Sequence, residues 1–226
     1  MFLKNIKRLL LFIVLVIGSS SFQCSEPINE ALQEVQLIFP VSISPPQSSI
    51  NLTDSLQIEA TLPDTLQDYI SKRYFRLVDF DFKTRIMVRK LTSNQISFIE
   101  SPPAIDRFGF YNLVGGAYNF LSSTVNVELK YIDNQYLFKF KMIPKDKGVY
   151  MVSFLYFPNE NRVVKNLIND PNTGQLKDAT MSFMVYNINN GNINFDLFKA
   201  NTKIPSNLGS EPDFNNRFGI FTFEVK

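Results

Sequence analysis

Long runs of alternating apolar and polar residues constrain this chain more than any other feature of its sequence. Between Tyr136 and Met142, every second residue is Tyr, Phe or Met, and Lys139 and Lys141 stand among the residues between them. Side chains alternate between the two faces of a β-strand, so this segment predicts a strand with one buried face and one wet face. Such runs recur along the chain while helical periodicity is scarce, and we therefore expect an all-β protein.

Turn-forming residues separate the alternating runs and set the expected element order. Asp133-Asn134 lies between two such runs and predicts a tight hairpin. Two short helices are expected as well, one at residues 162–168, whose apolar residues fall on one helical face, and one at residues 195–200. Strands are predicted at Val35–Ile43, Ser55–Leu62, Arg85–Leu91, Val125–Tyr131, Tyr136–Ile143, Val149–Phe157, Met181–Ile188 and Phe218–Val225.

The segment Asp146-Lys-Gly148-Val-Tyr150-Met-Val152 carries the most specific indication of fold. It resembles the Asp-x-Gly-x-Tyr-x-Cys corner of immunoglobulin-like domains, in which the Tyr hydroxyl hydrogen-bonds to the backbone upstream. Asp54–Thr61 is similar to strand B of the same domains. The resemblance implies an immunoglobulin-like antiparallel β-sandwich. The chain departs from it in that Val152 replaces the cysteine and no tryptophan is present.

The domain boundaries follow from this resemblance. It covers about residues 34–190, so residues 34–226 are predicted to form one β-sandwich domain with a C-terminal elaboration at 191–226. Residues 102–121 exceed a minimal sandwich and are expected to form an insertion or an elaborated sheet edge. The class is therefore all-β with insertions and one or two short helices.

The N-terminus has the pattern of a secretory signal. Three basic residues fall within the first eight, an unbroken apolar run covers residues 9–17, and small residues follow at 18–21. The apolar run is about half of the ~20 residues that span a bilayer. Cys24, the one cysteine of the chain, then resembles the lipidation site of a bacterial lipoprotein, with residues 1–23 as the signal peptide and 24–33 as a polar tether.

Ser21-Phe22-Gln23 differs from the usual lipobox and is similar to the looser form in lipoproteins of Bacteroidota. The alternative is ordinary signal cleavage near Ser21, which leaves a free Cys24. If the resemblance holds, Ser25 after the lipidated cysteine implies the outer membrane, by analogy with proteobacterial sorting. The whole chain resembles uncharacterised outer-membrane lipoproteins of Bacteroidota.

Charge and composition exclude several classes. Removing residues 1–23 takes away three basic residues and no acidic one, so 23 basic and 21 acidic residues become 20 and 21, a net charge of −1. Without a basic surplus, nucleic acid is not an expected partner. A lipidated Cys24 leaves no cysteine for a disulfide, and the 22 Phe and 9 Tyr must supply the core.

The absence of histidine excludes Ser-His-Asp and Cys-His catalysis and the commonest zinc ligand. A carboxylate pair remains: on one strand face Asp79 and Asp81 would lie ~7 Å apart, within the range of inverting glycosidases. The competing interpretation is that Phe80 and Phe82 face the core while both aspartates face water. It is favoured, and we expect no enzyme.

Asp170-x-Asn172-x-Gly174, with Asp178 beyond, resembles a fragment of a calcium loop. Two of the ligand positions of such a loop are held by Gly174 and Met181, which favours a solvated turn over a metal site. We expect no metal and no cofactor.

An aromatic and glycine-rich segment offers the first choice for a recognition surface. Two interpretations remain open: the rings present contact area to a protein or glycan, or they plug one end of the sandwich. The residues concerned are Phe108, Phe110, Tyr111, Tyr118 and Phe120.

Two further sites match the Asp-Ser/Thr-aliphatic sequence that some Bacteroidota glycosylate in exported proteins. Ser55 and Thr65 would be the acceptors. Asp-Ser also suits the turn before a strand, which is the alternative.

Together these observations predict a non-enzymatic, lipid-anchored envelope protein that binds, adheres or serves as an accessory subunit, with a membrane partner through its N-terminal lipid and an unidentified protein or glycan partner. The alternatives are a fimbrial-type structural subunit, with cleavage after Arg73 or Arg85 to release a donor strand, and a glycoside hydrolase using Asp79 and Asp81.

Overall fold

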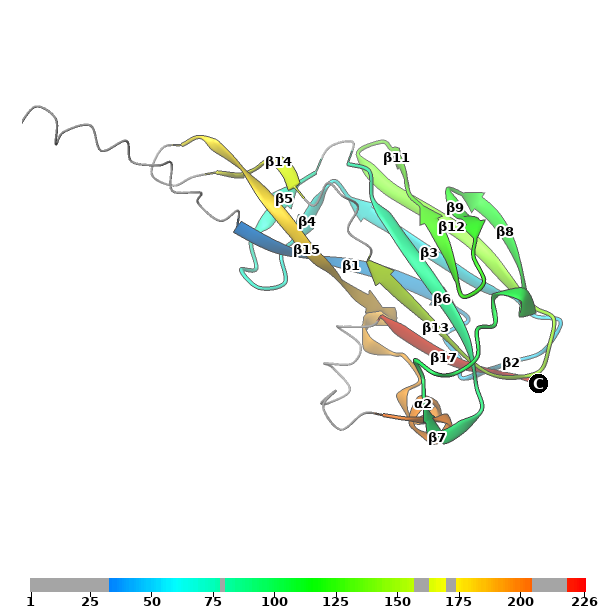
Figure 1. The fold of residues 1–226 in the computed structure, drawn as a ribbon. Helices are drawn as coiled ribbons and strands as arrows, with labels where there is room; N and C mark the ends of the chain where they lie inside the picture. Colours follow the sequence, from blue (N-terminus) through cyan, green and yellow to red (C-terminus); the bar gives the residue numbers. More distant parts are fainter. Residues whose placement is uncertain (1–32, 78–79, 157–162, 170–173, 205–218) are drawn as a thin grey trace, which may run out of the picture. The chain divides into compact units, whose positions relative to one another are not determined.

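Two β-sheets pack face to face in the computed structural model, which describes residues 33–77, 80–156, 163–169, 174–204 and 219–226 (Figure 1). The first sheet has the order β11-β12-β3-β1-β15-β14, and β8 also pairs with β12. Its strands are β1 (Gln33–Ser44), β3 (Leu56–Pro63), β8 (Phe108–Val114), β11 (Lys130–Ile132), β12 (Gln135–Pro144), β14 (Val163–Asn169) and β15 (Leu176–Ile188).

The second sheet has the order β2-β17-β13-β6-β10-β9. Its strands are β2 (Ser49–Ile50), β6 (Lys83–Leu91), β9 (Gly116–Phe120), β10 (Thr124–Glu128), β13 (Gly148–Tyr156) and β17 (Ile220–Val225). Smaller elements complete the fold: the pairs β4 (Thr65–Gln67) with β5 (Tyr74–Arg76) and β7 (Ser93–Ser97) with β16 (Thr202–Lys203), the helix α2 (Phe195–Asn201), and the 3-10 turns η1 (Ile105–Arg107) and η2 (Asn189–Gly191).

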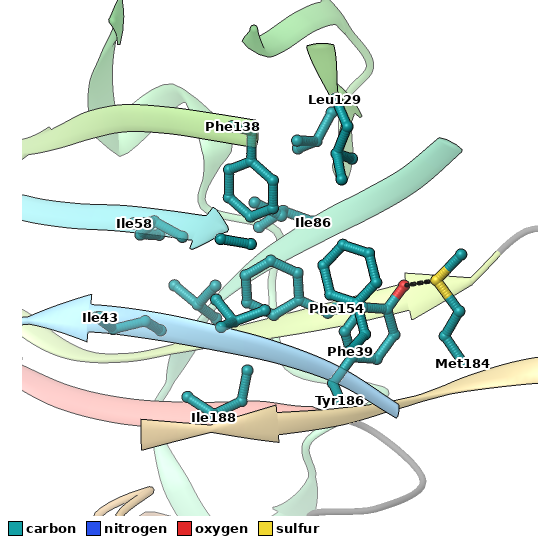
Figure 2. Close-up of a cluster of buried hydrophobic side chains, with 14 of the residues drawn as sticks. Phe39, Ile43, Ile58, Ile86, Leu129, Phe138, Phe154, Met184, Tyr186 and Ile188 are labelled. Carbon is teal, nitrogen blue, oxygen red and sulfur yellow. Dashed lines mark hydrogen bonds between the residues drawn. The ribbon is translucent and has the colours of Figure 1, made fainter. Parts of the chain in front are cut away.

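Aromatic side chains fill the space between the sheets. Figure 2 shows Ile86 and Phe154 of the second sheet with Phe39, Phe138 and Tyr186 of the first. The ring of Phe39 lies 5.4 Å from that of Tyr186 and 6.4 Å from that of Phe138. Each such ring buries about 150–250 Å², so aromatic burial supplies much of the stabilisation in this disulfide-free core.

A second, smaller core covers the outer face of the second sheet. Met87, Met151 and Ile220 project from β6, β13 and β17, and Phe198 of α2 and Phe98 after β7 pack on them. The rings of Phe98 and Phe198 lie 5.8 Å apart. The second sheet is thus covered on both faces here, which explains how apolar residues can occur on both sides of β13 and β17.

Several local predictions are confirmed. Strand β12 buries Tyr136, Phe138, Phe140 and Met142 and turns its lysines outward. Asp133 and Asn134 join β11 to β12 with φ of 50° and 61°, and Ile132 pairs with Gln135, which is the geometry of a two-residue type I′ hairpin. The helix expected at residues 195–200 is α2.

The helix predicted at residues 162–168 is wrong, because Val163–Asn169 forms strand β14. Val163 and Val164 pair with Thr180 and Ala179 of β15, and the register shifts before Ile168. Val and Ile favour strands, and β15 offered an unpaired edge, so pairing outweighed the apolar spacing that suggested a helix.

Two larger expectations also change. The sheets are mixed rather than purely antiparallel, since β1 runs parallel to β15 and β17 runs parallel to β2. The core does not stop near residue 190: β17 lies between β2 and β13, with Phe221 and Phe223 fully buried. A β-strand pairs by position in space and not by position in the sequence, so the last strand of the chain belongs to the central sandwich.

Candidate functional site

The strands β8 and β9 carry a row of exposed apolar side chains along two sheet edges. Within the part of the chain that the structure describes, β8 pairs with β12 alone and β9 with β10 alone. We call the exposed residues on and next to these strands the β8–β9 surface. They are Tyr111 (58% exposed), Leu113 (52%), Tyr118 (39%), Phe120 (50%) and Leu121 (45%).

The two interpretations of the aromatic segment each apply to different residues. Phe108 is 3% exposed and packs edge-on against Tyr150, with ring centroids 4.9 Å apart, so it belongs to the core. Phe110 is half-buried and lies between Phe140 and Phe120, at 6.1 and 5.1 Å. Phe108 is therefore a core residue, while Phe110 supports the ring of Phe120 from the edge of the core.

The remaining three members of the predicted set differ from Phe108 and Phe110 in their exposure. Tyr111, Tyr118 and Phe120 are exposed, and large apolar side chains on a monomer surface are informative when they gather on one element. The structure thus separates the predicted segment into supporting rings and presented rings.

Asn112 fastens β9 to β8. Its amide nitrogen donates to the Ala117 carbonyl oxygen at 2.7 Å, and its side-chain oxygen accepts from the Ala117 N–H at 2.8 Å. Gly116 makes this contact feasible: its φ is 105°, and a Cβ there would lie 2.5 Å from the Asn112 side-chain oxygen. Asn119 then bends the strand with φ of 48°. A capped and bent edge resists addition of another strand, so this surface offers side chains rather than backbone.

A groove of about 430 Å³ lies at the base of β8, beside the β8–β9 surface. Phe108, Phe110, Phe120 and Leu121 supply its apolar lining, while Asp106 and Lys145 add polar groups. The Lys145 ammonium donates to the Asp106 backbone oxygen at 3.3 Å. The groove can therefore take an apolar group of a partner next to the exposed rings.

A second groove, of about 580 Å³, lies between Ser48–Ser49, residues 191–197 and the end of β17. Its surroundings are polar, and the asparagines nearby are used for structure. Asn189 pairs through its side chain with both backbone groups of Ile43, and the Asn194 amide donates to the Thr222 oxygen at 2.8 Å. This groove brings together no set of groups with evident chemistry.

The corner at Asp146–Tyr150 contains the hydrogen bond that its motif implies. The Tyr150 hydroxyl donates to the Asp146 backbone oxygen at 3.2 Å, while the ring is fully buried. Gly148 has φ of 146°, and a Cβ there would lie 2.6 Å from Cε of Lys90. Gly148 thus leaves space for the side chain of Lys90, a residue outside the Asp146–Val152 motif.

Lys90 ties the corner together electrostatically. Its ammonium lies 2.9 Å from the Asp146 carboxylate and also donates to the Lys147 oxygen at 2.9 Å. The hydrogen bond from Lys90 lowers the pKa of Asp146, and the same bond raises the pKa of Lys90. Burial raises the pKa of Tyr150, which keeps its hydroxyl protonated as a donor.

The carboxylates weighed for catalysis are not brought into a site by the described residues. Asp79 lies outside them, and Asp81 is exposed between half-buried Phe80 and buried Phe82. Asp81 lines neither groove described above. Arg85 lies inside β6, which is paired on both sides, whereas Arg73 lies in an exposed loop.

Other predicted positions are placed as follows. Asp170 and Asn172 of the calcium-like segment lie outside the described residues, and among those described no cluster of three or more metal-binding Cys, Asp or Glu side chains is found.

Ser55 is half-buried just before β3. Thr65, also half-buried, donates to the Asp64 carboxylate at 3.1 Å. Cys24, with the predicted signal peptide and tether, lies outside the described residues. No helix in the described part is long and apolar enough to cross a bilayer.

Sequence reasoning missed several residues that shape these sites. Leu113 and Leu121 belong to the β8–β9 surface, Asn112 fastens it, and Lys90 completes the corner. Leu113 continues the alternation of Tyr111 along β8, so strand periodicity could have identified it. Asn112 and Lys90 act through long-range contacts that no local pattern indicates.

Comparisons with family models, with curated proteins and with solved structures gave no match.

Proposed function

We propose that the protein is a non-enzymatic, lipid-anchored cell-envelope protein that binds a partner protein through the β8–β9 surface. The exposure of five apolar side chains on and next to two successive edge strands carries this proposal. Aromatic residues are enriched at protein interfaces, and the adjoining apolar groove gives such an interface a recessed centre. Leu113 and Leu121 favour a protein over a glycan, because aliphatic side chains recognise apolar surfaces.

The anchor part of the proposal rests on the signal pattern before Cys24. The fimbrial alternative has less support, because the Asn112 side chain occupies both backbone groups of Ala117 in β9 and because Arg85 lies within a doubly paired strand. The hydrolase alternative is weakened by the exposure of Asp81 away from both grooves.

We also propose that the sandwich is of the immunoglobulin type. Its support is the strand order: β1-β3-β12-β8 corresponds to A-B-E-D, and β17-β13-β6-β10 corresponds to G-F-C-C′. The Tyr150 hydrogen bond at the start of β13 matches the corner before strand F. The fold departs from that type in two ways: β15 and β14 are added beyond β1, and β8, assigned to D, precedes β10, assigned to C′, along the chain.

Crosslinking in intact cells tests the binding proposal. The full chain, the double variant Tyr111→Ser/Phe120→Ser and the control Ile132→Ser are compared, Ile132 being 44% exposed on the neighbouring strand β11. Loss of an aromatic anchor typically costs ~2 kcal/mol of binding, about 30-fold in affinity. A partner should therefore crosslink to the full chain and to the control and be lost from the double variant. Equal crosslinking of all three, with unchanged urea midpoints, would refute the assignment of this surface.

A further inference from the structure

A short loop at the start of the sandwich exposes apolar and cationic side chains together. Residues 68–74, here called the β4–β5 tip, connect β4 to the start of β5. Ile70 is 63% exposed, Tyr74 67% and Tyr69 36%. Lys72 and Arg73 lie between them and are also exposed, and no acidic residue occurs from Tyr69 to Tyr74.

Asp68 gives the β4–β5 tip a fixed shape. Its side chain is 2% exposed and accepts from the backbone N–H groups of Gln36 at 2.7 Å and Ser71 at 2.6 Å. Its own N–H donates to the Arg73 oxygen at 2.8 Å, and its oxygen accepts from the Lys72 N–H at 3.0 Å. Although burial raises the pKa of Asp68, the hydrogen bonds that its carboxylate accepts from Ser71 and Gln36 outweigh burial and lower it. The apolar side chains are therefore held outward by a buried, ionised carboxylate.

The same contacts fix the tip beside the chain's entry into the sandwich. The Tyr69 N–H donates to the Gln36 oxygen at 2.6 Å, and Gln36 is the fourth residue of β1. Gln33, where β1 begins, is the ninth residue after Cys24. Nine extended residues reach at most ~30 Å, so a lipid on Cys24 would keep the start of β1 within that distance of the bilayer.

The neighbouring hairpin adds to this end of the sandwich. Ala179 of β15 pairs with Gln33, so Leu176 and Lys177 extend past the beginning of β1. Leu176 is 58% exposed, and Lys177 is exposed as well. Figure 1 shows β4, β5 and β14 gathered where β1 starts, well apart from β8 and β9. The flanking strands also carry two carboxylates, Glu34 and Asp178.

We propose that the β4–β5 tip rests on the lipid surface, with Ile70 and Tyr74 in the headgroup region and Lys72 and Arg73 at lipid phosphates. Tyrosine is enriched at membrane interfaces, and cations near anionic lipids contribute ~1 kcal/mol each. The inference rests on the proposed lipid anchor, because the tip alone offers too small an apolar area to hold the protein. Its role is to orient the sandwich, so that the β8–β9 surface is held away from the bilayer.

Fluorescence of an introduced tryptophan tests this contact, since the chain contains no Trp. The full-length Tyr74→Trp protein is reconstituted into phosphatidylcholine–phosphatidylglycerol vesicles with brominated acyl chains. Contact with the bilayer predicts a blue shift and loss of emission relative to vesicles without bromine. Tyr111→Trp, at a position of comparable exposure on β8, is the matched control and should keep its emission. Ile70→Trp provides a second probe within the tip.

The outcomes separate the tip from the anchor. Flotation of the full chain with vesicles, lost in Cys24→Ser, reports lipidation alone. If the protein floats while the tip probes keep their emission, the membrane contact is refuted although the anchor stands. Quenching of Tyr111→Trp to the same degree would also overturn the proposal, since it would show no preferred orientation. Protection of the tip probes from acrylamide in native envelopes, without quenching by bromolipid, would assign the tip to a protein partner instead.

Discussion

Replacement of Tyr150 by Phe removes one oxygen atom from the corner that leads into β13. The hydroxyl makes a 3.2 Å hydrogen bond to the Asp146 backbone oxygen and a weaker contact of 3.5 Å to that of Lys147. The ring keeps its packing, since its contacts with Phe108 at 4.9 Å and Phe223 at 6.0 Å do not involve the oxygen. The change therefore removes the contacts of the hydroxyl without disturbing the ring, and the loss of such a hydrogen bond lowers the free energy of unfolding by ~0.5–1.5 kcal/mol.

Urea unfolding of the full chain measures this difference. With a slope of ~2 kcal/mol per molar urea, a loss of ~1 kcal/mol lowers the midpoint by about 0.5 M without changing the slope. The control is Tyr131→Phe, because the hydrogen bond that the Tyr131 hydroxyl makes within the described residues is an exposed one of 3.4 Å to Asn134, and the midpoint of this variant should stay constant. An unchanged midpoint for Tyr150→Phe would refute the inference that the corner hydrogen bond stabilises the start of β13.

Four further changes test other parts of the structure. Gly116→Ala should lower the free energy of unfolding more than Gly191→Ala does. Both glycines have a positive φ, which costs a residue with a side chain ~1–2 kcal/mol, but only at Gly116 would the new Cβ collide with Asn112. Equal losses on urea unfolding would contradict the Asn112 contact. Thr222→Val should raise the free energy of unfolding by up to ~1 kcal/mol, because the Thr222 hydroxyl is buried and has no hydrogen-bond partner among the described residues. A lowered urea midpoint would contradict this reasoning. Asp68 has a lowered pKa when folded, so its stabilisation is complete above the unfolded value of ~3.9 and is lost as the pH falls through the lower folded value. Asp68→Asn should therefore be less stable than the natural chain at pH 7, and the gap in urea midpoints should narrow only below about pH 4. Cys24→Ser should move the protein from the membrane to the soluble fraction on cell fractionation, and unchanged membrane association would argue against lipidation.

Local patterns predicted the strands well because most of them are half-buried. The alternation of apolar and polar residues in β12 indicates which of its side chains face the core. Asp133 and Asn134 tolerate the positive φ that a type I′ turn needs. The helix α2 was predicted for a similar reason, since the faces of a short amphipathic segment are visible in its sequence.

Partner choice between strands was less predictable, because it depends on residues far apart in the chain. Val163 and Val164 became part of a strand only because β15 offered an open edge, and β17 joined β13 from the far end of the sequence. The candidate site divides in the same way. The sequence shows that aromatic residues gather in this segment. It does not show that Phe108 faces the core while Tyr111 faces water, because that depends on how β8 packs against the rest of the fold.

The position of β1 gives the sandwich a mechanical property. A pull on the chain before Gln33 acts along β1, which is paired sideways to β15 from Gln33 to Val41 and to β3 from Ser42 to Ser44. These hydrogen bonds lie across the direction of pull, so they are loaded together in shear and do not open one at a time from the end. If the protein is tethered at its N-terminus and bound to a partner at β8–β9, tension between the two passes through β1, whose pairing with β15 and then β3 resists that tension while the domain is folded.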